Sequence, residues 1–375
     1  MASSPLIGRE REVAAAHEAM ERTRWLTLTG PGGVGKTRLA LDLAAQPTPR
    51  PADGAWLVDL AAVSAGADVA AETTRTLRLR SSGGPAAFDS LCRHLAGRDV
   101  LLILDNCEHV VDPCADLAAA LLRSCPGLRI LATSRESFGI DGEAVLNLDP
   151  LPPEDASRLF VERARQRMAD FVLGEDDDAA LAQLCARLDH LPLGIELAAA
   201  RVPMMSVAEI LTSVESSLAE RSGRQRRPPP PHRRSARAAI RWSQQLLDPA
   251  EQKAFRNLAV FVGGFDEAAA RAVAPGLTIE MLARLVDSSL VTVVPSARGR
   301  TRYRLLETVR EYAWELLADA GEAAAAASRH LHHYASLGDD ASARWPSLNA
   351  RQLAADLEDD YANVRVAAEW AATAD

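Results

Sequence analysis

The segment GPGGVGKT, residues 30–37, constrains the fold more than any other part of this chain. It lies between an apolar run, WLTLT at 25–29, and a helical segment that begins RLALDLA. A strand, a glycine-rich turn and a helix in this order form a phosphate-binding loop. Glycine permits positive φ angles and a close approach of backbone N–H groups to an anion at the helix N-terminus. We expect these properties from Gly30, Gly32, Gly33 and Gly35.

The last two residues of the loop predict a nucleotide with a metal ion. The amine of Lys36 would reach the β- and γ-phosphates, and the hydroxyl of Thr37 would ligate Mg²⁺. Val34 and Arg38 complete the predicted contacts of the loop with the nucleotide. A glycine-rich turn without a ligand is the alternative, but the Lys-Thr pair between a strand and a helix favours ATP or ADP with Mg²⁺.

Composition restricts the class of protein. A chain of 375 residues predicts two to four domains, and 48% hydrophobic with 25% charged residues indicates a folded, soluble protein. A formal charge of −9 disfavours extensive nucleic-acid binding. We expect a cytoplasmic protein without membrane contact, because the sequence has neither a signal peptide nor an apolar run of about 18 residues.

Five cysteines are spread along the chain without a C-x-x-C pair. We expect reduced, mostly buried thiols. Cys107 and His109 have a spacing that could suggest a metal, but no second ligand pair accompanies them.

The distribution of apolar runs predicts a multidomain protein of α/β plus α class. Runs at 24–29, 55–60, 99–104 and 128–133 alternate with helical patterns, which predicts a parallel sheet covered by helices on both faces. After Asp149 the strand signal stops, and 153–218 reads as helices. Residues 221–237 are rich in proline and arginine and predict an extended linker or surface loop; contact of this basic run with nucleic acid is the alternative.

Beyond the linker, helices precede two short strand-like runs, LVTVV and RYRLL, around the loop PSARGRT. This order is typical of a winged-helix domain. From Thr308 the chain is helical again, with Trp314, Trp345 and Trp370 on helical faces. The last segments resemble the opening of a helical-repeat array, so we expect a piece of a longer protein.

Two strand ends carry candidate site residues. LLILDN at 101–106 reads as a buried strand that ends in Asp105, which fits the Walker B role of holding Mg²⁺. A turn-capping acid is the alternative. Many related ATPases have a second, water-activating carboxylate next, but here Asn106 cannot accept a proton. Glu108 is the nearest substitute. We therefore expect slow hydrolysis, and a turnover above roughly 10 per second would contradict it.

LRILATSRE at 128–136 predicts a further strand, with Arg135 at its carboxyl end. A planar guanidinium can make two charge-assisted bonds to phosphate, so Arg135 is a candidate sensor of the γ-phosphate; a surface salt bridge is the alternative. Pro192 opens the helix of LPLGIELAAARV and could pack on an adenine ring, or simply start the helix.

These segments occur together and in order with LIGREREV, LLILDNCEH, LDPLPPEDA, RWSQQLLDPAEQKAFRNLAVFVGGF and RYRLLETVREYA. Together they resemble the signal-transduction ATPases with numerous domains (STAND), which include the NB-ARC proteins, and within them the bacterial LuxR-type and antibiotic-regulatory-protein-type transcription regulators. The resemblance implies a P-loop nucleotide-binding domain at 1–150, a helical domain at 151–222, the Pro/Arg-rich linker at 223–234, a winged helix at 235–317 and the start of a tetratricopeptide-like (TPR-like) sensor at 318–375.

The resemblance also implies a mechanism. In such proteins ADP is buried between the nucleotide-binding and winged-helix domains, and exchange for ATP opens the molecule for oligomerisation. Ile7, Gly8 and Arg9 match the loop that covers base and ribose; Arg135 matches the γ-phosphate sensor and Pro192 the adenine contact. Leu306 stands where a histidine binds the ADP β-phosphate, with Glu307 after it, so the lock on ADP must use another group or be weaker.

Three functions follow. The first is a nucleotide-controlled switch of a transcription regulator, with slow ATP hydrolysis, self-association in the ATP state, and contacts to DNA or the transcription machinery through modules not identified in this chain. The second is a DNA-binding initiator ATPase of the origin-recognition type, against which the acidic charge and the LPLG motif stand. The third, a small-molecule kinase, has only the phosphate loop in its favour.

Overall fold

The computed structural model describes residues 6–46, 51–63, 69–79, 85–174, 177–219, 231–295, 301–344 and 359–373. The chain divides into two compact units. Unit 1 consists of Met1–Leu159 together with Asp189–Leu193, and unit 2 of Phe160–Leu188 together with Gly194–Asp375.

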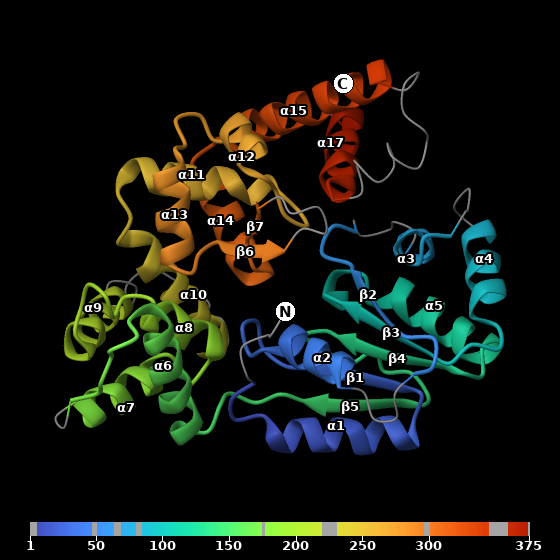
Figure 1. The fold of residues 1–375 in the computed structure, drawn as a ribbon, viewed down its shortest axis with the longest axis horizontal. Coiled ribbons are helices and arrows are strands. Elements are labelled where there is room, and N and C mark those ends of the chain that lie inside the picture. The colour runs from blue at the N-terminus through green and yellow to red at the C-terminus, as the bar shows by residue number, and fades with distance from the viewer. Residues whose placement is uncertain are drawn as a thin grey trace. The chain divides into compact units, whose positions relative to one another are not determined.

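Unit 1 is built on a five-stranded parallel sheet with the strand order β2-β3-β4-β1-β5 (Figure 1). The strands are β1 (Trp25–Thr29), β2 (Ala55–Asp59), β3 (Val100–Asp105), β4 (Leu128–Thr133) and β5 (Glu143–Asn147). Four of them occupy the apolar runs predicted from the sequence. The sequence did not predict β5, because it is an edge strand whose side chains are only partly buried, with Val145 50% exposed.

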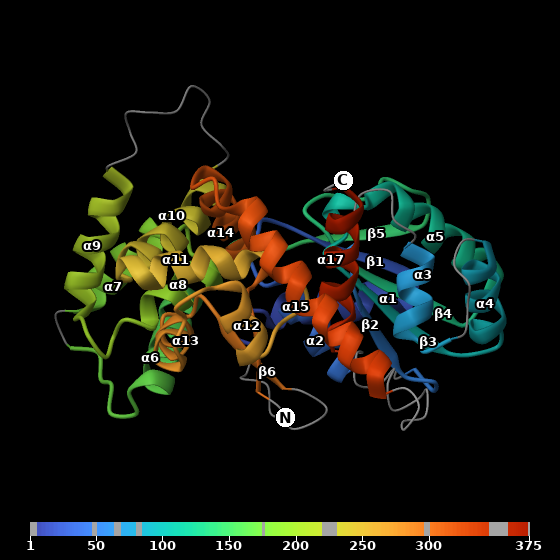
Figure 2. The ribbon, with the colours of Figure 1, turned by 90° about the horizontal axis from the view of Figure 1, so that it is seen from above.

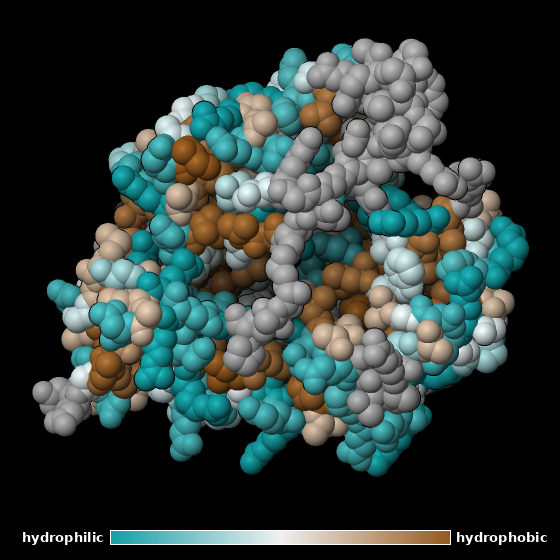
Figure 3. Space-filling view, viewed as in Figure 1, coloured by the Kyte–Doolittle hydropathy of each residue, from teal (hydrophilic) through white to brown (hydrophobic). Residues whose placement is uncertain are grey.

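Helices cover both faces of this sheet (Figures 1 and 2). On one face, α1 (Glu10–Arg22) and α2 (Lys36–Ala45) contact β1. On the other, α3 (Val69–Thr76), α4 (Pro85–Leu95) and α5 (Val111–Ser124) pack together over a core that includes Trp25, Leu102 and Leu104. Strands β1 and β3 are buried along their whole length, as a doubly covered parallel sheet requires. The outward side of α1 is hydrophilic (Figure 3).

The first part of unit 2 is helical. It contains α7 (Asp177–Arg187), α9 (Val207–Ala219) and α10 (Pro231–Gln245), and it receives α6 (Pro153–Arg167) and α8 (Pro192–Ala199), which both begin in unit 1. Helix α10 begins inside the segment predicted as an extended linker, which corrects that prediction. Pro231 fits the first turn of a helix, where its missing N–H costs no hydrogen bond. The apolar side chains of α10, such as Ile240 and Trp242, are buried. Residues 220–230 lie outside the described chain.

Next come the elements of a winged helix, in the order expected from the sequence. They are α11 (Pro249–Asn257), the 3-10 helix η2 (Leu258–Val260), α12 (Glu267–Val273), α13 (Ile279–Asp287), the antiparallel pair β6 (Thr292–Pro295) and β7 (Thr301–Arg304), and α14 (Glu307–Asp319). Phe265 pairs with Tyr303, which adds a third short extended segment to the hairpin.

Two helices end unit 2, α15 (Ala323–Arg344) and α17 (Tyr361–Thr373), and they contact each other. Buried Asn363 accepts a hydrogen bond from Val262 N at 2.8 Å and donates one to Gly264 O at 2.7 Å. Arg302 pairs with Asp360 at 2.8 Å. These contacts attach α17 to the winged helix. Within the predicted repeat start, residues 345–358, which include Trp345, and residues 374–375 lie outside the described chain. Within the described residues, every helix is too short or too polar to cross a membrane.

Candidate nucleotide-binding site

The phosphate loop joins β1 to α2 at the carboxyl edge of the sheet. Gly30, Gly33 and Gly35 have positive φ angles of 141°, 81° and 102°. Gly32 is not among the described residues with positive φ, contrary to the prediction. The reason is the turn, in which Val34 N donates to Pro31 O at 3.4 Å. A turn of type II requires a positive φ only at its third residue, here Gly33.

Two of these glycines are also required by space. A β-carbon on Gly30 would lie 2.6 Å from Leu148 O, and one on Gly33 would lie 2.8 Å from the β-carbon of Leu193. Leu193 N donates to Gly33 O at 3.2 Å. The loop is therefore packed against the end of β5 and the start of α8 within unit 1.

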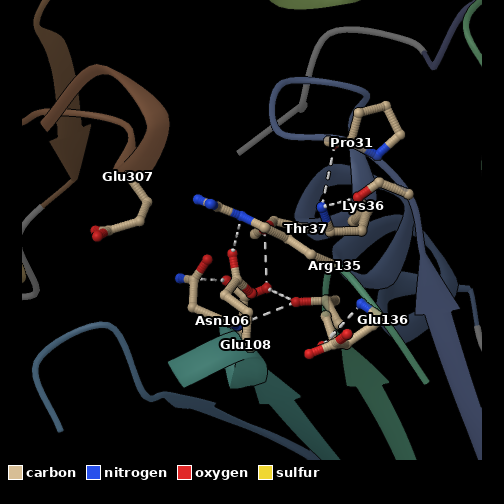
Figure 4. Close-up of polar contacts among 12 residues, drawn as sticks. Pro31, Lys36, Thr37, Asn106, Glu108, Arg135, Glu136 and Glu307 are labelled. Carbon is tan, nitrogen blue, oxygen red and sulfur yellow. Dashed lines mark hydrogen bonds and ion pairs between the residues drawn. The ribbon is translucent and has the colours of Figure 1, made fainter. Parts of the chain in front are cut away.

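The polar residues of the loop lie next to the end of β3 (Figure 4). Lys36 Nζ donates to the carbonyl oxygens of Gly30 at 2.9 Å and Pro31 at 3.2 Å. Thr37 Oγ1 donates to Asp105 Oδ1 at 2.8 Å. Thr133 Oγ1, at the end of β4, donates to the same oxygen at 2.5 Å. The structure thus brings together the amine, hydroxyl and carboxylate that the sequence assigned to phosphate and metal.

The donor set fits Mg²⁺. This ion prefers oxygen ligands and binds proteins through one or two side chains together with phosphates. Thr37 Oγ1 and Asp105 Oδ1 are adjacent oxygens of this kind, and Asp105 is only 2% exposed. These two side chains would hold the ion, which would neutralise phosphate charge there.

Asn106 connects two carboxylates. Its backbone is left-handed, with φ 62°. Its Nδ2 donates to Asp59 Oδ1 at 3.2 Å and to Asp105 Oδ2 at 3.4 Å. The amide therefore acts as a donor where a water-activating base would have to accept. Asp59 was missed in the sequence. It is the last residue of β2 and pairs in register with Asp105. The sequence feature that could have revealed it is an acidic residue at the end of a second apolar run.

Glu108 and Arg135, which the sequence assigned to separate roles, form an ion pair (Figure 4). Arg135 Nε lies 2.9 Å from Glu108 Oε1, and the side chains are 23% and 17% exposed. The 3-10 helix η1 (Cys107–His109) places Glu108 beyond β3, and Arg135 follows the neighbouring strand β4.

Residues near the N-terminus contact the phosphate loop and the segment that follows β5. Arg9 is 3% exposed, and its Nη2 donates to Val34 O at 3.1 Å and to Asp149 O at 2.7 Å. It also pairs with Glu12. Gly8 has a φ of 66°, and a β-carbon there would lie 2.5 Å from that of Asp155. Arg9 therefore connects the loop to the end of β5. The resemblance implied that Arg9 covers the base and ribose, but it did not predict these two backbone contacts.

Four further residues were predicted to contact the nucleotide. Val34 is fully buried, whereas Ile7 and Arg38 are half-buried. Pro192 is the first residue of α8, directly before Leu193, which packs on Gly33. The preceding His190 accepts a hydrogen bond from Leu151 N at 3.1 Å. Pro192 is thus held close to the phosphate loop by its neighbours on both sides.

Comparison with known proteins places the chain in a family. A family model described as a winged helix-turn-helix domain matches residues 247–318. A "Putative HTH-type transcriptional regulator" of Mycobacterium tuberculosis is 44% identical over 359 residues, which cover 94% of this chain and 40% of that relative. An uncharacterized protein of the same species is 40% identical over 338 residues, which cover 87% of this chain and 85% of the relative.

Among solved structures, a STAND protein with a tetratricopeptide repeat sensor from Pyrococcus horikoshii has a TM-score of 0.59 at 17% identity, over 89% of this chain and 46% of that one. The chain belongs to the family of these mycobacterial proteins, and it has the fold of a STAND protein. The resemblance to this class and the predicted fold class are therefore confirmed. The chain spans less than half the length of the first relative, since it covers 40% of it.

Leu306 and Glu307, which the resemblance aligned with the ADP-binding motif, belong to unit 2. Leu306 is the N-cap of α14 and is 41% exposed. Glu307 forms an ion pair with Arg310 at 2.6 Å. The leucine side chain has no polar atom, so the residue at this position contributes no hydrogen bond from its side chain to a phosphate.

The five cysteines are free thiols, four buried and Cys92 half-buried. Burial raises the pKa of Cys107, whose Sγ donates to Leu104 O at 3.3 Å. His109 Nε2 instead lies 2.7 Å from Val63 O. The two residues that suggested a metal from their spacing thus contact different backbone carbonyls.

Proposed function

We propose that this chain is the ATP- and ADP-binding switch of a transcription regulator, and that its nucleotide state controls domain opening and self-association. The observation that carries the proposal is the hydrogen-bonded set Thr37, Asp105 and Thr133 beside Lys36 in a phosphate loop. In the proposal the whole protein is cytoplasmic, and contacts to DNA or the transcription machinery belong to parts outside this chain.

We assign phosphate binding and metal binding to different residues of the site. Lys36 and the loop N–H groups would bind the β- and γ-phosphates, while Thr37 and Asp105 would hold Mg²⁺. Arg135 would bind the γ-phosphate through its guanidinium. A nucleotide shifts the balance between two domain arrangements if its binding free energy differs between them by a few kcal/mol. Slow hydrolysis follows, because the amide of Asn106 donates to two carboxylates and cannot accept a proton from water.

The test is to denature the purified protein and identify the released nucleotide by ion-pair chromatography. We expect near-stoichiometric ADP from the wild type and none from Lys36→Ala. The chain has only one other lysine, the exposed Lys253, so Lys253→Ala is a matched control that should retain ADP. A wild type that neither carries nor binds ADP or ATP would contradict the proposal.

The alternative is a DNA-binding initiator ATPase, which the match to a winged helix-turn-helix domain favours. In the usual arrangement of such a domain, the helix before the hairpin reads DNA. Here that helix, α13, exposes Glu280 and Asp287, and its Arg284 pairs with Glu251 at 2.8 Å. Negative charge on this helix opposes binding to phosphates. Tight duplex binding by this chain, weakening steeply with salt, would favour the alternative.

A further inference from the structure

The ion pair between Glu108 and Arg135 is poorly exposed to water and incompletely satisfied. The two side chains are 17% and 23% exposed, so their attraction is screened less than that of a surface pair. The second carboxylate oxygen, Glu108 Oε2, is buried and makes no hydrogen bond within the described part of the chain. A buried oxygen of this kind is costly, so Glu108 depends on its contact with the guanidinium.

Arg135 lies at the edge of the sheet where phosphate is expected. It follows Thr133 by two residues, and Thr133 and Thr37 donate to the same oxygen of Asp105. Thr37 belongs to the phosphate loop, which follows β1. Arg135 follows β4, and β4 is a direct neighbour of β1 in the sheet. A phosphate can accept two charge-assisted hydrogen bonds from one guanidinium, which makes it a competitor of a carboxylate for Arg135.

We propose that Glu108 is the resting counter-ion of Arg135, and that it thereby determines how strongly the site prefers a nucleoside triphosphate over a diphosphate. This inference rests on the proposed function. A γ-phosphate competes with Glu108 for the guanidinium of Arg135, so the cost of weakening the ion pair reduces the affinity for the triphosphate. A diphosphate has no γ-phosphate and leaves the pair intact. The carboxylate thus weakens the binding of ATP relative to that of ADP and favours the ADP-bound state.

The experiment compares the dissociation constants of Mg·ADP and of Mg·AMP-PNP, a triphosphate that is not hydrolysed, by titration calorimetry on the whole chain. Glu108→Gln should tighten AMP-PNP binding about fivefold to tenfold, the range for loss of a partly buried ion pair, and change ADP binding less than about twofold. Glu108→Asp, whose shorter side chain cannot keep the contact, should act in the same direction and serves if the glutamine variant folds poorly.

A double-mutant cycle separates counter-ion exchange from a simpler cause. If Glu108 only repelled phosphate, its replacement would tighten AMP-PNP binding even without the arginine. We expect instead that Glu108→Gln has no effect in an Arg135→Ala background. Asp99→Asn is the matched control, since Asp99 pairs with Arg129 at 2.9 Å across the same two strands at their opposite ends. It should leave both constants unchanged.

The outcomes distinguish the two proposals. Wild type that binds neither nucleotide overturns the proposed function and this inference with it. Wild type that binds both, with an unchanged preference in Glu108→Gln and Glu108→Asp, overturns only the role of Glu108. An equal gain with and without Arg135 also overturns it, because the carboxylate would then act on the phosphate directly.

Discussion

At the scale of single residues, Asn106 places a hydrogen-bond donor at the position where a water-activating base would have to accept. Its left-handed backbone is a conformation that asparagine tolerates better than most side chains. Its amide lies between Asp59 and Asp105, which pair in register on neighbouring strands. A carboxylate at this position would add a third negative charge where the amide now supplies a donor. The amide to which we attribute slow hydrolysis in the proposed function therefore also separates two like charges.

Gly33 offers a test of the packing of the loop. Gly33→Ala would place a β-carbon 2.8 Å from that of Leu193 in a backbone with φ +81°. Gly139→Ala is the control, because φ there is +70° but nothing lies within 4 Å. We expect a loss of about 1 kcal/mol for Gly139→Ala from backbone strain alone. Gly33→Ala should lose about 1–3 kcal/mol more because of the clash.

Urea unfolding of both variants measures this difference in the free energy of unfolding. Nucleotide affinity should fall in Gly33→Ala and not in Gly139→Ala. Equal losses of stability would show that Leu193 moves aside without cost and that the contact does not hold the loop.

Local sequence patterns predicted Lys36, Thr37 and Asp105. Lys36 and Thr37 follow a strand and a turn that are contiguous with them in sequence, and Asp105 ends the apolar run of a separate strand. Asp59 and the contacts of Arg9 could not be found in this way, although the resemblance had named Arg9 itself. The position of Asp59 depends on the register of β2 against β3, and that of Arg9 on contacts with Val34 and Asp149. Neither is encoded locally.

At the scale of elements, burial decided which strands were visible in the sequence. Strands β1 and β3 are buried throughout and read as apolar runs. Strand β5 alternates intermediate and exposed residues over only five positions, so its pattern is too short and too polar to be distinguished from a loop. The start of α10 was obscured by prolines, which ordinarily end a helix but are accepted in its first turn.

The packing of α15 against α17 predicts a dependence of stability on pH. His330 is 2% exposed, and burial lowers its pKa to about 4; His333 adds to this, and the contact with Asn363 opposes it. The unfolded chain, with a histidine pKa of about 6.5, binds the proton first as pH falls. Stability of unit 2 should therefore decrease between pH 6.5 and 4, by up to about 3 kcal/mol, and be fully present above this range.

Chemical unfolding at several pH values measures this slope. His330→Gln should flatten it, because the titrating group is removed. His332→Gln is the control, since His332 is exposed on the same helix, and it should keep the slope. A slope that persists in His330→Gln would assign the effect to another group.

At the scale of the whole molecule, the chain forms two units, of which unit 1 contains the candidate site. A ligand stabilises the part of the protein that binds it, by about 2.7 kcal/mol at a concentration 100 times its dissociation constant. We expect Mg·ADP to slow amide exchange in β1, β3 and α2, and removal of Mg²⁺ by a chelator to reduce this protection.

Amide exchange read by mass spectrometry resolves the two units. The same titration on Lys36→Ala should give no protection. Protection confined to unit 2 in the wild type would place the nucleotide elsewhere and contradict the assignment of the loop.

The short segment Asp189–Leu193 belongs to unit 1 although it follows Leu159 only after a stretch that belongs to unit 2. In this segment Leu193 packs against Gly33, and the backbone carbonyl of His190 accepts a hydrogen bond from Leu151 N. Unit 1 is consequently not one continuous module that recombination could transfer by a single crossover. A chimaera that took its first 159 residues from one relative and the rest from another would combine a phosphate loop with a foreign supporting segment, so these two stretches must be inherited together.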